Sequence, residues 1–94
     1  MRAAKIDANQ NEIVEFLRKQ GATVQILSTV GKGCPDLLIG FNGKNLLMEI
    51  KDGKKTISQT KLTKAQVKWC LEWKGDVDIV FSIEDAQRVL SGYL

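Results

Sequence analysis

The sequence contains no histidine among its 94 residues. Histidine is the usual general base of enzymes and a frequent ligand of zinc. The two cysteines, Cys34 and Cys70, lie far apart without a CxxC spacing, so zinc clusters and Cys–His catalysis are excluded. Both are expected to be small buried side chains in a reducing compartment, not partners in a disulfide. Any hydrolytic chemistry would have to use carboxylates, lysine and a metal.

Long hydrophobic runs are also missing, and every apolar stretch is far shorter than the ~20 residues that a membrane-spanning helix needs. The first residues include an arginine and a lysine but no apolar segment of the kind that a secretory signal requires. Apolar residues make up 44% of the chain and charged residues 27%, a balance typical of soluble globular proteins. We therefore expect one domain over residues 1–94, located in the cytoplasm and not bound to a membrane.

Acidic residues are fewer than basic ones. The sequence has 11 Asp and Glu and 14 Lys and Arg, so the formal net charge is +3. The excess lies in the segment 51–74, which carries seven lysines against two acidic residues. Such a surface permits a polyanionic partner, but the same lysines could simply keep the protein soluble. Net charge alone does not decide between these two interpretations.

Apolar periodicity and turn residues predict an alternation of helices and strands. The expected elements are a helix over 8–20, strands over 23–27, 36–41 and 44–51, a helix over 64–74, a strand over 77–81 and a helix over 83–90. The order αβββαβα is typical of an α/β fold with a mixed β-sheet flanked by helices. Because both faces of the 36–51 hairpin carry apolar residues, its strands should be central and covered on both sides.

Three helix starts carry capping signals. Asp7 with Gln10 and Thr63 with Gln66 have the capping-box spacing, and Ser82 is a candidate N-cap. On the helix over 64–74, three apolar residues are expected to face inward: Val67, Cys70 and Leu71.

The hairpin holds charged residues within an otherwise apolar run. Asn42-Gly43 is the strongest short signal for a two-residue turn, and such a turn fixes the register of the two strands. This register places Asp36 opposite Glu49, and Lys51 lies on the same face as Glu49 because alternate strand residues share a face. Two carboxylates and one ammonium are thus expected in one cluster.

Two interpretations of this cluster are open. Lys51 could neutralise one carboxylate in a salt-bridged triad. Alternatively, Asp36 and Glu49 could bind a hard divalent cation such as Mg²⁺, which takes oxygen ligands and completes its shell with waters and backbone carbonyls. The cation would then activate a water toward a phosphoryl group, with Lys51 stabilising the attacking hydroxide. Two carboxylates and one ammonium leave a net negative site, which favours the interpretation as a metal site.

The spacing of these residues resembles a nuclease signature. Pro35-Asp36 followed by Glu49-Ile50-Lys51 is similar to the PD-(D/E)xK motif, and αβββαβ is the core order of that superfamily. Three segments, 33–38, 47–51 and 62–66, occur in the order of the VRR-NUC (virus-type replication-repair nuclease) family. The chain therefore resembles a stand-alone VRR-NUC domain of the phage or bacterial type over nearly its whole length.

The resemblance implies a restriction-endonuclease-like core and a metal-dependent endonuclease that hydrolyses phosphodiester bonds in structured DNA. It implies Mg²⁺ as the cofactor, with Mn²⁺ able to substitute, and no small organic cofactor. The implied substrate is branched DNA such as a four-way junction, as for Holliday-junction resolvases, and the implied assembly is a homodimer. The competing hypothesis is a nucleic-acid-binding module with a degenerate, inactive site.

The resemblance also assigns residues. The implied catalytic residues are Asp36, Glu49, Lys51 and Gln66. The implied metal ligands are the Asp36 and Glu49 carboxylates, the Ile50 carbonyl and a glutamate of the first helix, for which Glu12 is the candidate and Glu15 the alternative. Gln66 could touch the phosphate or the water, or it could complete the cap of Thr63, and one side chain is not expected to do both.

The expected nucleic-acid contacts are Ser28, Lys32, Lys54, Lys55, Lys61, Lys64 and Lys68. Lysines beside a metal site would hold the phosphate backbone without reading the base sequence. Trp69 and Trp73, four residues apart, are expected in the core or at a dimer contact instead of serving as stacking platforms for bases.

Overall fold

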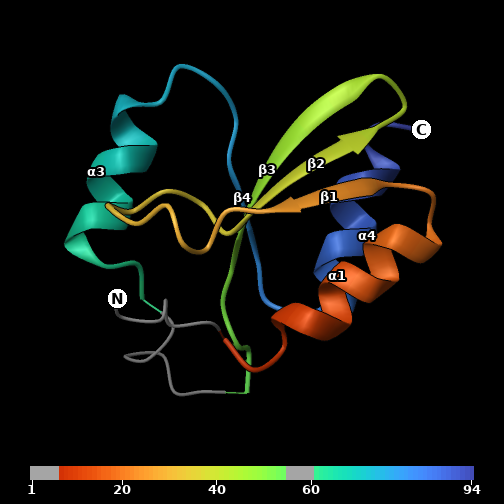
Figure 1. The fold of residues 1–94 in the computed structure, drawn as a ribbon, viewed down its shortest axis with the longest axis horizontal. Coiled ribbons are helices and arrows are strands. Elements are labelled where there is room, and N and C mark those ends of the chain that lie inside the picture. The colour runs from red at the N-terminus through yellow and green to blue at the C-terminus, as the bar shows by residue number, and fades with distance from the viewer. Residues whose placement is uncertain (1–6, 55–60) are drawn as a thin grey trace.

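The computed structural model describes residues 7–54 and 61–94, whose helices and strands follow the predicted order αβββαβα (Figure 1). Their bounds are α1 Gln10–Lys19, β1 Thr23–Ile26, β2 Leu37–Phe41, β3 Lys44–Ile50, α3 Lys64–Glu72, β4 Asp78–Val80 and α4 Ile83–Ser91. Each predicted element is present. In the parts of the chain described, the structure contains no helix long and apolar enough to cross a membrane.

The four strands form one mixed sheet in the order β1-β2-β3-β4. The pairs β1–β2 and β2–β3 are antiparallel, whereas β4 joins the sheet parallel to β3. The hairpin strands β2 and β3 are therefore central, as predicted. Two parallel strands need a long crossover connection, and the crossover from β3 to β4 contains α3.

The β2–β3 hairpin has the predicted register. Both turn residues, Asn42 and Gly43, have positive φ angles of 49° and 76°, the conformation of a type I′ turn, which matches the twist of the flanking strands. The pairs continue without interruption from the turn to Leu37 and Met48. The turn thus determines which residues meet at the far end of the hairpin.

The helices α1 and α4 lie together beside the sheet, whereas α3 stands apart on the other side (Figure 1). The buried core consists of Ile13, Val14, Leu17, Ala22, Leu37, Ile39, Leu46, Met48, Ile50, Val80, Ala86 and Leu90. Successive strand residues point to opposite faces, so the buried Leu37 and Ile39 alternate with Leu38, which is 38% exposed. One face of the sheet therefore carries the core that α1 and α4 cover.

The helix α3 has no buried residue. The prediction that Val67 and Leu71 face inward is wrong, because these residues are 42% and 80% exposed, and Cys70 is only partly buried. The reason is Gln66, which points toward β3 and places Cys70, one helical turn later, on the same side. Val67 and Leu71 each follow one position later, about 100° around the helix, and so face solvent.

The second face of the sheet is only partly covered, so the expected cover on both sides is wrong for the part of the chain described. A groove of about 610 Å³ lies between this face and α3. Leu38 and Leu47 line it from the sheet, and Trp69 and Trp73 line it from α3. The two indole rings are stacked with their centroids 4.6 Å apart, yet Trp73 remains 47% exposed. We refer to this feature as the tryptophan groove.

Two of the three capping predictions are confirmed. Thr63 caps α3 in a full capping box, and Ser82 caps α4. The box predicted between Asp7 and Gln10 is wrong, because α1 begins after Asn9, whose side chain makes no capping hydrogen bond. The Gln10 side chain is instead buried in the interior.

Candidate active site

The ends of β2 and β3 bring two acidic side chains together. Asp36 lies one step beyond the Leu37–Met48 pair, which places it across from Glu49. The backbone N–H of Ile50 donates to Asp36 Oδ2 at 2.8 Å and anchors this carboxylate. The two carboxyl groups are close enough for Asp36 to raise the pKa of Glu49 through its charge and through hydrogen bonding. The juxtaposition expected from the register is therefore present.

Glu49 has a pKa well above that of an ordinary glutamate. The residue is only 3% exposed. Burial raises its pKa, the charge of Asp36 and the hydrogen bond to it raise the pKa further, and Lys51 lowers it, with a net result of about 8. A cation that binds such a carboxyl group must displace its proton. The pair is therefore a place where a divalent cation could take the place of that proton.

The raised pKa of Glu49 predicts how stability depends on pH. Between the ordinary glutamate pKa of 4.5 and the folded value of about 8, the folded protein holds one more proton than the unfolded chain. The free energy of unfolding therefore falls as the pH rises through this window. Glu49→Gln mimics the protonated group, so in EDTA at about pH 9 we expect it to be more stable than the wild type by ~2 kcal/mol or more, roughly 10 °C in Tm. At about pH 5 the two should differ little.

Thermal unfolding followed by circular dichroism at the two pH values measures this difference. Glu15→Gln is the matched control, since Glu15 is an exposed glutamate of α1. A Glu49→Gln variant that is less stable than the wild type at both pH values would contradict a raised pKa of Glu49.

Lys51 lies beside Glu49 and is held by Gln66. Its ammonium donates to Gln66 Oε1 at 3.0 Å and lies 3.9 Å from Glu49 Oε2. The residue is only 7% exposed. Lys51 lowers the pKa of Glu49, but burial and the neighbouring Asp36 raise it by more. A single ammonium therefore does not offset what two neighbouring carboxyl groups and their burial do to the pKa of Glu49.

Gln66 completes the cap of Thr63 and also reaches the charged cluster, whereas its contact with phosphate or water stays a prediction. Its Oε1 accepts from the Thr63 N–H at 2.8 Å and from Lys51 Nζ, while its Nε2 donates to Glu49 Oε2 at 3.0 Å. A carbonyl oxygen has two lone pairs, so one amide can complete the cap, hold the lysine and still reach the carboxylate. The cap of α3 is therefore part of the active-site geometry.

A close backbone contact holds α3 beside the site. Gly33 has a φ angle of 82° and lies against the backbone of Ala65 and Gln66. A Cβ at this position would overlap the Ala65 carbonyl, and a positive φ is itself unfavourable for other residues. Glycine therefore permits both the conformation of this loop and its approach to α3.

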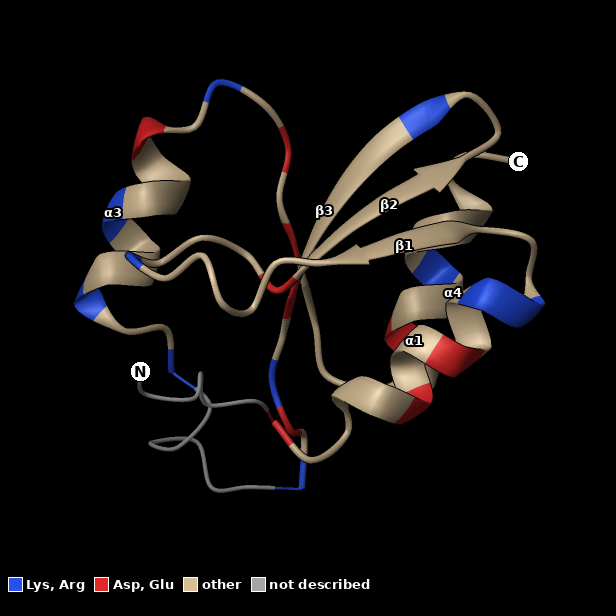
Figure 2. Cartoon of the chain, in the orientation of Figure 1, with Lys and Arg blue, Asp and Glu red and all other residues tan. Residues whose placement is uncertain are grey.

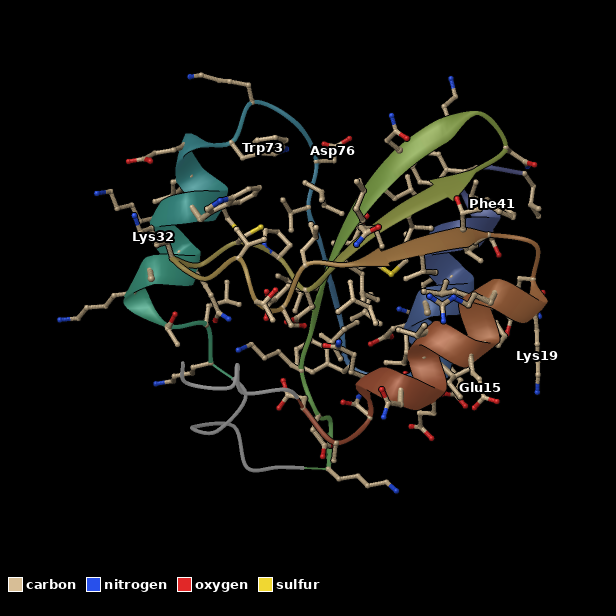
Figure 3. The ribbon with its side chains drawn as sticks, in the orientation of Figure 1. Glu15, Lys19, Lys32, Phe41, Trp73 and Asp76 are labelled. Carbon is tan, nitrogen blue, oxygen red and sulfur yellow. The ribbon has the colours of Figure 1, made fainter. Side chains whose placement is uncertain are left out.

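Asp7 is a further acid whose charge acts on Glu49 and raises its pKa. It precedes α1. Glu12 is exposed and lines a separate hollow near Lys54, and Glu15 lies on the outer side of α1 (Figure 3). Among the described residues, no recorded contact joins either glutamate to the acidic pair, so Glu12 as a ligand remains an unsupported prediction. The sequence reasoning missed Asp7 because it assigned this residue to a helix cap.

The donor set fits a hard cation that keeps most of its water. Within residues 7–54 and 61–94, no three side chains of His, Cys, Asp or Glu lie close enough to form a metal site by themselves. Mg²⁺ commonly binds through one or two carboxylates and retains several waters. The Asp36–Glu49 pair matches this requirement, with Asp7 nearby and the Ile50 carbonyl as an expected further ligand. The residues therefore fit Mg²⁺ or Mn²⁺ better than zinc.

Several basic residues lie on α3 and in the segments next to it (Figure 2). Lys61, Lys64 and Lys68 are exposed on or just before this helix. Lys32 is also exposed and lies beside α3 (Figure 3), in the loop that Gly33 packs against it. These four expected nucleic-acid contacts thus belong to one side of the molecule.

The other three expected contacts differ from this group. Lys54 is exposed shortly after β3. Lys55 lies outside the described residues. Ser28 is partly buried, and its hydroxyl accepts a hydrogen bond from Gln10 Nε2 at 3.1 Å. A contact from Ser28 to phosphate would therefore compete with this internal bond.

No family model matches the sequence, and no curated protein matches it. A solved structure described as a VRR_NUC domain aligns with this chain at a TM-score of 0.69 and 20% sequence identity. The alignment covers 94% of this chain and 100% of that one. This chain has the fold of a VRR_NUC domain. The resemblance that the motif order indicated is thus confirmed at the level of the fold, with its mixed sheet and flanking helices.

Proposed function

We propose that this protein is a metal-dependent endonuclease that hydrolyses phosphodiester bonds in structured DNA. The observation that carries this proposal is the juxtaposition of the partly buried Asp36 with the buried Glu49, whose pKa is raised although Lys51 lies beside it. Such a pair costs stability, and perturbed carboxyl groups of this kind are characteristic of functional sites. Among the hydrolases that could use such a site, the VRR_NUC fold favours a nuclease.

Each side chain has a defined task in the proposed reaction. Mg²⁺ held by Asp36 and Glu49, with the Ile50 carbonyl as a further ligand, would supply a polarised phosphoryl oxygen and a coordinated water of lowered pKa. Lys51 would stabilise the negative charge that develops on the phosphoryl group. Gln66 holds the Lys51 ammonium at a fixed place beside Glu49, so little reorganisation is needed during the reaction.

The lysines around α3 are the proposed contacts for the DNA backbone. Lys64 and Lys68 are four residues apart and share one side of the helix. Gln66 belongs to the same helix and reaches into the site. The helix α3 therefore carries both the proposed phosphate contacts and a residue that shapes the site. This arrangement supports a substrate bound across α3 and the end of β3.

Cleavage assays with a labelled four-way junction, a matched linear duplex and single-stranded DNA test the proposal, each in Mg²⁺, Mn²⁺ or EDTA. We expect cleavage of the junction with either metal, slower cleavage of the duplex and none in EDTA. No cleavage of any substrate with either metal would overturn the nuclease proposal. Binding of the junction without cleavage would instead favour a nucleic-acid-binding module with an inactive site.

We also propose that two copies associate through the tryptophan groove, whose apolar side chains the chain leaves exposed. Leu38→Glu places a charge on this face at a position that is already 38% exposed, so we expect a folded monomer where the wild type forms a dimer. Leu71→Glu is the control, because Leu71 is 80% exposed on the outer side of α3. Sedimentation velocity distinguishes the states, and a wild type that stays monomeric at ~100 μM would contradict the proposed association.

A further inference from the structure

The chain leaves β3 and β4 at the same place. The last pair of this parallel ladder joins Ile50 to Val80, and two further backbone bonds follow, from the Lys51 N–H to the Val80 carbonyl at 2.9 Å and from the Gly53 N–H to the Phe81 carbonyl at 3.4 Å. The carbonyls of Lys51 and Phe81 lie beyond the last pair of the ladder. Lys51 also supplies the ammonium of the candidate site, so its backbone position affects where that ammonium lies.

A single side chain joins these two carbonyls. Asn9 Nδ2 donates to the Lys51 carbonyl at 3.1 Å and to the Phe81 carbonyl at 3.1 Å. Both donors of the amide are therefore used. Rotating the amide by 180° would place its oxygen against two carbonyl oxygens, so the orientation of the Asn9 side chain is determined.

This orientation has a cost for α1. Asn9 is the N-cap residue, where an asparagine oxygen normally accepts a hydrogen bond from the first turn, yet its side chain makes no such bond. Its Oδ1 is buried and accepts no hydrogen bond from the described residues. A buried acceptor without a partner is unfavourable. The structure thus keeps Asn9 turned toward the strand ends at the expense of the helix cap.

The contacts of Asn9 connect the two sides of the candidate site. Asp7, whose charge acts on Glu49, lies two residues before Asn9 in the segment that enters α1. Lys51, whose carbonyl Asn9 holds, donates its ammonium to Gln66. The segment is anchored a second time by the buried Gln10. Asn9 therefore ties the chain that carries Asp7 to the strand that carries Lys51.

We propose that Asn9 is a positioning residue of the active site: it fixes the backbone of Lys51 relative to the start of α1 through its two hydrogen bonds to the ends of β3 and β4. This inference rests on the proposed nuclease function. It predicts that the two amide donors matter more than the volume of the side chain. Asn9→Asp keeps the shape but turns an oxygen toward the two carbonyls, whereas Asn9→Ala removes the side chain.

The test compares Asn9→Ala, Asn9→Asp and the control Asn11→Ala, which alters an exposed asparagine of α1. Under single-turnover conditions with Mg²⁺ and a four-way junction, we expect both Asn9 variants to cleave about 10- to 100-fold more slowly than the wild type, because small misplacements of reacting groups reduce rates by such factors. Junction affinity in EDTA should change less than ~2-fold, since Asn9 is not a proposed DNA contact. Asn11→Ala should cleave at the wild-type rate.

A second measurement needs neither metal nor DNA. Hydrogen exchange at the Lys51 amide should accelerate about tenfold in both Asn9 variants and stay unchanged in Asn11→Ala, because local opening at the strand ends becomes easier. An Asn9→Asp variant that cleaves at the wild-type rate, or Lys51 exchange that does not change, would overturn the proposal. If the wild type cleaves no DNA, the nuclease function fails, and the exchange data still decide whether Asn9 holds the strand ends.

Discussion

Replacing Lys51 with methionine is expected to slow DNA cleavage by about 10²- to 10³-fold while leaving the protein folded. The rate falls because a fixed ammonium beside the reacting phosphate stabilises the charge of the transition state, and loss of one such group typically has this effect. The fold should persist because the raised pKa of Glu49 favours its neutral form, so removal of the nearby cation leaves little uncompensated buried charge. Methionine also retains the apolar stem of the side chain. Single-turnover cleavage and thermal unfolding of the same preparation measure both effects.

The same variant separates the two interpretations of the charged cluster. A salt-bridged triad with no catalytic role predicts strong destabilisation, about 3–5 kcal/mol, because one partner of a buried ion pair is lost. Lys44→Met is the control, since Lys44 is an exposed lysine at the other end of β3. A Lys51→Met protein that is greatly destabilised and yet cleaves DNA at the wild-type rate would contradict our account of Lys51.

Gly33→Ala is expected to lower the free energy of unfolding by about 3 kcal/mol or more and to reduce cleavage at the same time. The added Cβ would overlap the Ala65 carbonyl, so either the 31–34 loop or α3 must move. Movement of α3 displaces Gln66, which holds both Lys51 and Glu49. Denaturant unfolding and a cleavage assay on the same protein should therefore both show a loss.

Gly31→Ala isolates the steric part of this effect. Gly31 also has a positive φ angle, 78°, but a Cβ there would meet no atom within 4 Å. Its alanine variant should therefore show only the conformational cost of a positive φ, about 1–2 kcal/mol, with cleavage retained. If Gly33→Ala and Gly31→Ala are equally stable and equally active, the contact between Gly33 and α3 does not maintain the site.

The hairpin could be predicted from the sequence because its determinants are local. Asn42-Gly43 favours positive φ at both turn positions, and the turn then fixes every pair of the two strands. The meeting of Asp36 and Glu49 follows from this register without knowledge of any other element. The caps of α3 and α4 could be predicted for the same reason, since a cap involves residues only a few positions apart.

The position of α3 could not be predicted, because it depends on contacts between residues distant in sequence. The apolar residues of this helix suggested an inward face that included Val67 and Leu71. The helix is instead oriented by Gln66 at the site and by the approach of Gly33, and neither contact leaves a periodic signal. The only available indication in the sequence was Gly33, two residues before the single proline. The closeness of Gly33 to α3 appears only in three dimensions.

The place of Asp7 was missed for a related reason. A residue three positions before Gln10 has the spacing of a capping box, and local reasoning assigned Asp7 to that role. In the structure Gln10 is buried and bonds to Ser28, so α1 starts later and Asp7 belongs to the segment near Glu49. A buried glutamine at a helix start cannot be recognised from the sequence of the helix alone.

The central claim is that the Asp36–Glu49 pair forms the metal-dependent hydrolytic site of this protein. Its most direct test is the single-turnover rate of junction cleavage in Mg²⁺ by the wild type and by Asp36→Asn, expressed and purified side by side. Our account predicts that the wild type cleaves the junction and that Asp36→Asn cleaves it at least ~10³-fold more slowly, because an amide cannot replace a carboxylate as a ligand of a hard cation. Equal rates for the two proteins, or no cleavage by the wild type, would contradict the claim.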